Sequence, residues 1–154
     1  MPDVNLQAPD WLLQMENILE TLNEGVVITD DALRVVFANE ALLRLTGFER
    51  GELRGRTPEA IFSAEDIPYL MQQYAIAQRN RHHRHEYHLP RKNGERVPVI
   101  FSGRMITGPD GLQYSVLTLT DITAQKRAQE EIRQANVLLT ICPSCSSNFA
   151  NLRA

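Results

Sequence analysis

The chain has 154 residues, a length that suits one domain with flanking segments around a single hydrophobic core. Its content of 43% hydrophobic and 23% charged residues is ordinary for a globular protein, and a net charge of -3 gives no general attraction to nucleic acid or to anionic membranes. The sequence shows no apolar run of roughly 20 residues, no secretion signal and too few cysteines for a disulfide framework, so a cytoplasmic protein is expected.

The N-terminal region is predicted to be a short lead-in followed by a flanking helix. Residues 1–9 contain two prolines and few apolar side chains, which predicts disorder. A helix is expected over 10–24, with Asp10 capping its first turn. Its apolar residues recur at helical spacing: Leu12, Met15, Leu19 and Leu22. A helix this apolar on one face needs a partner, either the domain's own sheet or a second subunit.

The central region, 25–122, is predicted to form the main domain. Two β-branched runs, 25–30 and 34–39, have the composition of paired strands joined by a tight turn. Short helices and turns are expected over 41–63, before a longer helix over 64–79.

Three more strands are predicted after that helix, over 82–90, 95–106 and 112–120. The first two are joined across Asn93 and Gly94, a dipeptide that favours the primed turns of hairpins. The order of two strands, several short helices and three strands predicts an α+β domain with an antiparallel sheet. The helices would cover one face of the sheet and enclose an apolar interior.

The last predicted strand leads at once into a polar helix over 123–140. Its apolar residues have the spacing of an a/d seam: Ala128, Ile132, Ala135 and Leu139. The junction consists of Asp121, Ile122 and Thr123, and we expect it to relay changes in the sheet to the helix. Asp121 lies where the strand pairing stops, and Thr123 can cap the helix. The alternative is a plain helix cap with no switching role.

Five segments, in this order and at this spacing, resemble the PAS family of sensory domains: NEGVVITD, VVFANEAL, LTGFERGELRG, HLPRKNGERVPV and TLTDITAQKRAQEE. The resemblance runs from about Met15 to Gln134. It implies a five-stranded antiparallel sheet that cups a small pocket, with flanking helices that dimerise and signal. Members bind haem, flavin, small metabolites or nothing, so the resemblance leaves the ligand unknown.

Two departures from the family's patterns bear on cofactors. Light-sensing flavin members carry a reactive cysteine in a Gly-Arg-Asn-Cys type of motif, whereas this chain has Gly55-Arg56-Thr57-Pro58. Haem members often place an axial histidine on the long helix, and no histidine lies within 64–79. Neither a cysteinyl-flavin nor a haem is therefore expected, and no covalent cofactor is predicted.

Apolar and aromatic residues of the predicted strands and helices are candidates for a ligand pocket, since such pockets are mostly apolar with a few polar groups. The candidates are Phe37, Ile61, Phe62, Leu70, Tyr74, Tyr87, Phe101 and Tyr114. The alternative is that these side chains simply fill the core and leave no void.

Two groups of residues are weak candidates for metal binding. All four histidines lie on one predicted strand, where His83 and His85 project to the same face. This histidine run could form a metal site, act as a proton sensor or simply be a polar strand end. Cys142 and Cys145 have the spacing of half a zinc site or a redox pair. Because metal sites need three or four converging ligands, no metal is expected, and 141–154 is predicted to be a flexible tail.

No catalytic Ser/His/Asp set, phosphate-binding glycine loop or paired acidic motif occurs at a meaningful spacing, so an enzyme is not expected. The resemblance instead implies a sensor and dimerisation module in bacterial signal transduction, such as a two-component system. Its partners would be a second copy, bound through the terminal helices, and the output domain of a histidine kinase, a cyclic-dinucleotide enzyme or a transcription factor. The alternatives are a stand-alone small-molecule binding protein and a purely structural dimerisation unit with a filled core.

Overall fold

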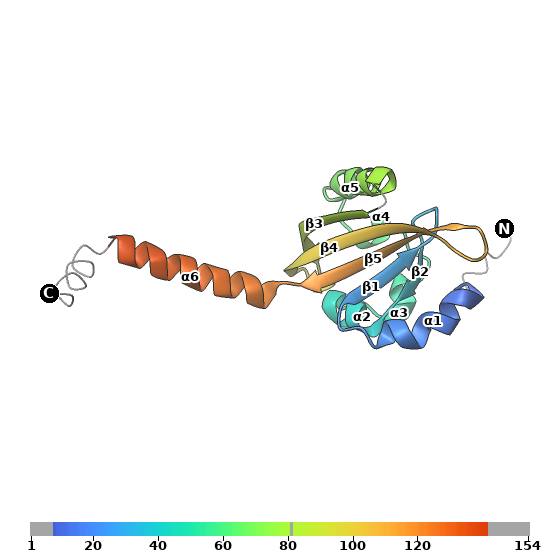
Figure 1. Cartoon of the computed structure of the whole chain (residues 1–154), viewed down its shortest axis with the longest axis horizontal. Helices are drawn as coiled ribbons and strands as arrows, with labels where there is room; N and C mark the ends of the chain where they lie inside the picture. Colours follow the sequence, from blue (N-terminus) through green and yellow to red (C-terminus); the bar gives the residue numbers. More distant parts are fainter. Residues whose placement is uncertain (1–7, 81, 142–154) are drawn as a thin grey trace. The chain divides into compact units, whose positions relative to one another are not determined.

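The computed structural model describes residues 8–80 and 82–141, and it divides the chain into two compact units after Asp121. Figure 1 shows the order of the elements in both units. The predictions for 1–7, for Cys142 and for Cys145 lie outside the described residues.

The first unit is built on a five-stranded antiparallel sheet with the strand order β2-β1-β5-β4-β3. The strands are β1 (Gly25–Thr29), β2 (Val35–Ala38), β3 (His82–Pro90), β4 (Arg96–Thr107) and β5 (Gln113–Asp121). The last strand in the sequence is the central one, because β5 pairs with β1 on one side and with β4 on the other. The predicted α+β fold with a five-stranded antiparallel sheet is thus confirmed.

Within 8–80 and 82–141 the chain also forms six helices. They are α1 (Asp10–Glu20), α2 (Glu40–Thr46), α3 (Arg50–Leu53), α4 (Pro58–Ile61), α5 (Ile67–Asn80) and α6 (Thr123–Ile141). α1 is shorter than predicted: the Thr21 hydroxyl donates to the Ile18 carbonyl at 2.6 Å and closes the last turn. Asp10 lies inside the first turn and does not cap it, because Pro9 occupies the capping position.

The sheet is covered by helices on both faces, and each face has its own apolar core. On one face, which we call the inner face, Leu42 of α2, Leu53 of α3 and Leu70 of α5 pack with strand residues such as Val99 and Leu119. The other, outer face is covered by α1. Its core consists of Ala8, Leu12, Val26, Ile28, Phe37 and Tyr114. Of the two partners considered for the N-terminal helix, the domain's own sheet is thus one that it contacts.

A buried asparagine joins α1, β1 and α2. The side chain of Asn39 is fully buried, and its Oδ1 accepts from the backbone N–H groups of Val26 (2.8 Å) and Leu42 (3.0 Å). Its Nδ2 donates to the carbonyls of Leu19 (3.0 Å) and Glu24 (2.9 Å). Every hydrogen-bonding position of this amide is thus occupied. The second pair of bonds holds the end of α1 and its linker against the sheet.

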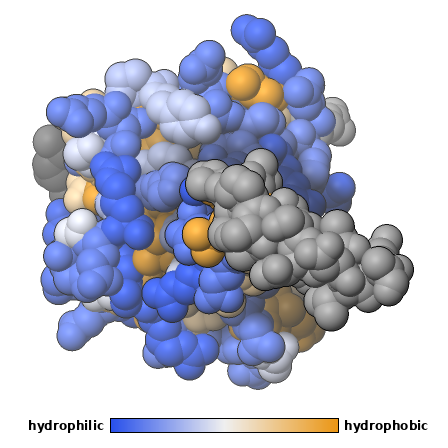
Figure 2. Space-filling model, turned by 90° about the vertical axis from the view of Figure 1, so that its left-hand side faces the viewer, coloured by the Kyte–Doolittle hydropathy of each residue, from blue (hydrophilic) through white to orange (hydrophobic). Residues whose placement is uncertain are grey.

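The described part of the second unit consists of Ile122 and α6, and Ile122 is the one residue between β5 and α6. Large apolar side chains of α6 lie exposed, including Ile132 (63%) and Leu138 (68%). α1 also leaves apolar side chains exposed on the face turned away from its core, including Leu13 and Ile18. Charged and polar residues cover most of the face drawn in Figure 2, with small apolar areas between them. Among the described helices, none is long and apolar enough to cross a membrane.

Candidate functional site

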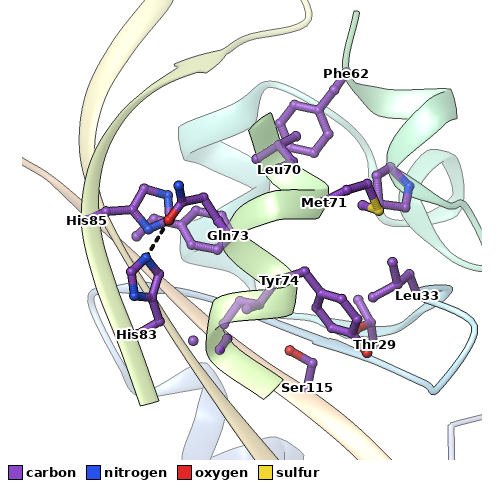
Figure 3. A pocket seen from close by; sticks show the side chains of 15 residues that line it. Thr29, Leu33, Phe62, Leu70, Met71, Gln73, Tyr74, His83, His85 and Ser115 are labelled. Atoms are coloured by element: carbon purple, nitrogen blue, oxygen red, sulfur yellow. Dashed lines mark hydrogen bonds between the residues drawn. The ribbon is translucent and has the colours of Figure 1, made fainter. Parts of the chain in front are cut away.

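An apolar cavity of about 90 Å³ lies between α5 and the inner face of the sheet (Figure 3). It is lined from several elements: Thr29, Leu33, Pro58, Phe62, Leu70, Met71, Gln73, Tyr74, Ala77, His83, His85, Phe101, Gly103, Ser115 and Leu117. A second cavity of similar volume adjoins it and shares lining residues with the first, among them Phe62 and Phe101. The interior of the domain is therefore not completely filled.

Gly103 leaves room for the side chain of Leu117 in the cavity wall. A Cβ atom at that position would lie 3.0 Å from a side-chain carbon of Leu117, which is a tight contact in a packed interior. Ala77 is the only buried residue of α5 besides Leu70, and it places a single methyl group against the cavity. At position 77 a larger side chain would extend into the cavity.

Figure 3 shows how most of the polar side chains of the cavity wall are arranged. His83, His85 and Gln73 lie together on one side, and Tyr74 lies with Thr29 toward the other. His83 Nε2 is hydrogen-bonded to Gln73 Oε1. Because the amide oxygen only accepts, this bond places the proton of a neutral His83 on Nε2.

His85 is packed among rings. Its ring centroid lies 5.0 Å from that of His83, 5.2 Å from that of Phe101 and 5.8 Å from that of Tyr69. Both of its ring nitrogens are buried and have no hydrogen-bond partner within the described residues. Burial lowers the pKa of His85 below its ordinary value, and the charge of His83 lowers this pKa further. Both effects favour a neutral His85 imidazole.

Several of the predicted pocket residues do lie around this space. Phe62, Leu70, Tyr74 and Phe101 line the first cavity, and Ile61 lines the second. Tyr87 is buried in the inner core, where its ring stacks on Tyr69 at 5.9 Å, but it lines neither cavity.

Phe37 and Tyr114, the other two predicted pocket residues, do not line these cavities. Both side chains belong to the outer core beneath α1. The Tyr114 ring meets the edge of Trp11 at a centroid distance of 5.3 Å, and its hydroxyl donates to Asp110 at 2.6 Å. The physical reason is that the sheet buries apolar residues on both faces. Alternation within a strand separates the two sets without showing which set faces the cavity.

Other lining residues were not predicted from the sequence. Thr29 and Ser115 are buried polar residues that face the cavity from paired positions on β1 and β5. His83 and His85 were considered as a metal site, a proton sensor or a polar strand end, and not as pocket residues. Within 8–80 and 82–141, no group of three or more potential ligands is placed to hold a metal ion. His83 and His85 alternate along the strand with the exposed His82 and His88. This alternation was the indication in the sequence that His83 and His85 face the interior.

The proposed relay residues lie at the boundary between the two units. Asp121 is the last residue of β5 and pairs with Val99 of β4. Ile122 is buried, and Thr123 is the first residue of α6.

A family model described as a PAS domain matches residues 23–124, about two thirds of the chain. Solved structures share the fold at low identity. A PAS domain from a two-component sensor histidine kinase is 13% identical with a TM-score of 0.60, and the match covers 72% of this chain and 96% of that one. A PAS domain of a protein from Colwellia psychrerythraea is 16% identical with a TM-score of 0.64, covering 75% and 99%. An RNA-binding light-oxygen-voltage receptor is 18% identical with a TM-score of 0.65, covering 90% of this chain and 40% of that one.

Proposed function

Because this chain belongs to the PAS domain family, we propose that its cavity binds a small molecule and that α6 carries the resulting change to an output domain. PAS domains are signal-sensing modules, and this part of the function follows from the family. The ligand, the relay and the output domain belong to the proposal. A histidine kinase is one candidate output, since one similar structure comes from such a protein. A cyclic-dinucleotide enzyme and a transcription factor are further candidate output domains that α6 would connect to the sensor.

One observation carries the proposal: β5 is both a wall of the cavity and the strand that continues into α6. Ser115 and Leu117 line the cavity, and the same strand ends at Asp121, with one residue between it and α6. β5 is also the central strand, so a shift in its pairing would change its bonds to both neighbours. A ligand that binds one arrangement of this strand more tightly would shift the population of states at the junction.

A cavity-filling substitution tests this relay without knowledge of the ligand. Ala77→Leu would place a larger apolar side chain into the cavity, whereas Ala75→Leu makes the same change at an exposed position of α5. We expect Ala77→Leu to change hydrogen exchange over 123–139 and Ala75→Leu to leave it unchanged. Identical exchange over this helix in both variants and the parent would contradict the relay.

We also propose that the chain forms a homodimer through its terminal helices. The seam residues of α6 include the exposed Ile132 and Leu139. On α1, the residues that do not reach the outer core include the exposed Leu13 and Ile18. Exposed apolar stripes on helices of this length are stabilised by pairing with a second helix.

The substitution Ile132→Glu tests the dimer, because it places a charge within the seam. We expect the parent to sediment as a dimer at ~100 μM, since specific dimers of this kind have dissociation constants below that concentration. The variant should shift toward monomer. Gln129→Glu adds the same charge to α6 at a polar position and serves as the control. A monomeric parent at this concentration would refute the dimer.

A further inference from the structure

The imidazole of His85 gives the cavity a specific hydrogen-bonding demand. This side chain lines the cavity, and both ring nitrogens are buried without a partner in the described part of the chain. A neutral imidazole offers one donor and one acceptor, and leaving them unpaired away from water is unfavourable. His83, the other imidazole in the wall, already bonds to Gln73. A ligand group that can both donate and accept would pair with whichever of these two nitrogens faces it.

The remaining lining residues favour an uncharged ligand. No lysine, arginine, aspartate or glutamate is among the residues that line either cavity. A bound carboxylate or ammonium group would therefore lose its hydration without gaining a permanent counter-charge, which is costly in an apolar site. His85 itself is packed between other rings and away from water, which disfavours its protonated form.

The walls of the space suit a single ring that extends across both adjoining cavities. Each cavity has a volume of about 90 Å³, which is less than the ~150 Å³ of an apolar cavity known to hold benzene, so a ring needs space from both. Aromatic side chains of the wall, including Phe62, Tyr74 and Phe101, provide faces and edges against which a planar ligand packs.

We propose that the cavity takes an uncharged, single-ring aromatic molecule that carries a hydroxyl group, and that this hydroxyl bonds to His85. The inference rests on the proposed function and names the ligand class of the same site. A hydroxyl is a donor and an acceptor at once, so it can serve whichever ring nitrogen faces it.

Phenol and toluene provide a matched pair of probes, because they differ by a hydroxyl in place of a methyl group. We expect phenol to bind about tenfold more tightly than toluene, as one hydrogen bond between uncharged groups gives. His85→Phe keeps an aromatic side chain but removes both nitrogens, and should reduce the affinity for phenol to that for toluene. His88→Phe makes the same substitution at an exposed position of β3 and should change neither affinity. NMR of ¹⁵N-labelled histidine should show the His85 nitrogens shifting when phenol binds.

The outcomes separate the ligand class from the sensor. Equal affinities for phenol and toluene, no phenol binding, or tighter binding of benzoate than of phenol would each overturn the proposed class. None of these results would change the outcome of the cavity-filling experiment on α6, which tests the relay by itself. Conversely, His85-dependent binding of phenol without any change in α6 would support the ligand class and contradict the relay.

Discussion

Replacing Asn39 by alanine tests whether this one side chain holds the N-terminal helix to the domain. The substitution removes the cap of α2, which costs about 1 kcal/mol, and leaves the buried N–H of Val26 unpaired, which costs about 1–2 kcal/mol. The carbonyls of Leu19 and Glu24 also lose their donor. We therefore expect a loss of about 3 kcal/mol in the free energy of unfolding, a large part of the stability of an ordinary domain.

A second substitution separates the cap from the link to α1. Asn39→Asp keeps the oxygen that accepts from Val26 and Leu42 but places a second oxygen against two carbonyls. We expect it to be strongly destabilising at pH 7, with faster hydrogen exchange throughout α1. Asn17→Ala, at an exposed position of α1, is the control and should leave stability unchanged or slightly raised.

Urea unfolding provides the measurement, since a lower midpoint at constant slope reports a change in stability. A loss below about 1 kcal/mol for Asn39→Ala would show that water or neighbouring groups replace the lost bonds. Wild-type stability for Asn39→Asp would show that only the cap matters and that the two bonds to the α1 region contribute nothing. Either result would refute the reasoning.

Three further predictions concern ionisable side chains. Hydrogen bonds from Arg96 and Ser63 lower the pKa of Asp66, so its carboxylate stabilises the fold above pH ~4 and loses this effect as pH falls. Asp66→Asn should therefore be less stable than the parent at pH 7. The difference in stability between the two proteins should disappear when unfolding is measured at successively lower pH. Burial raises the pKa of Tyr87 from 10.0 to about 12, so the neutral phenol stabilises the fold fully below pH 10 and this effect is lost as pH rises through 12. The unfolding midpoint of Tyr87→Phe should therefore depend less on pH in this range than the midpoint of the parent. Asp121→Ala should cost about 1 kcal/mol but clearly change hydrogen exchange over 123–139, and equal exchange would leave Asp121 an ordinary helix cap.

The sheet could be predicted from the sequence because local patterns determine it. The run at 82–90 alternates along its length and ends before a Lys-Asn-Gly turn, and β3 has these same bounds. The starts of helices were less predictable. α5 begins at Ile67, three residues later than expected, since Ser63 donates to the Asp66 side chain at 2.8 Å and the intervening residues form a turn.

The candidate site was only partly predictable, because its position depends on contacts between residues far apart in the sequence. Phe62 and Phe101 on the inner face and Tyr114 on the outer face are all aromatic residues, and the sequence pattern does not distinguish them. Only the docking of α1 on one side of the sheet decides which set borders the cavity. The open space itself depends on small residues such as Ala77 lying opposite the sheet. A hydropathy pattern indicates which residues are buried, but not whether their side chains fill the space between them.

The single residue between β5 and α6 has a consequence for how such a module can be joined to other proteins. Only Ile122 separates the last residue of β5 from the first residue of α6. Each residue inserted there would turn every later side chain by about 100° around the helix axis, and seven residues would nearly restore the original orientation. Functional fusions after this helix should therefore recur with the period of a heptad, whatever domain follows.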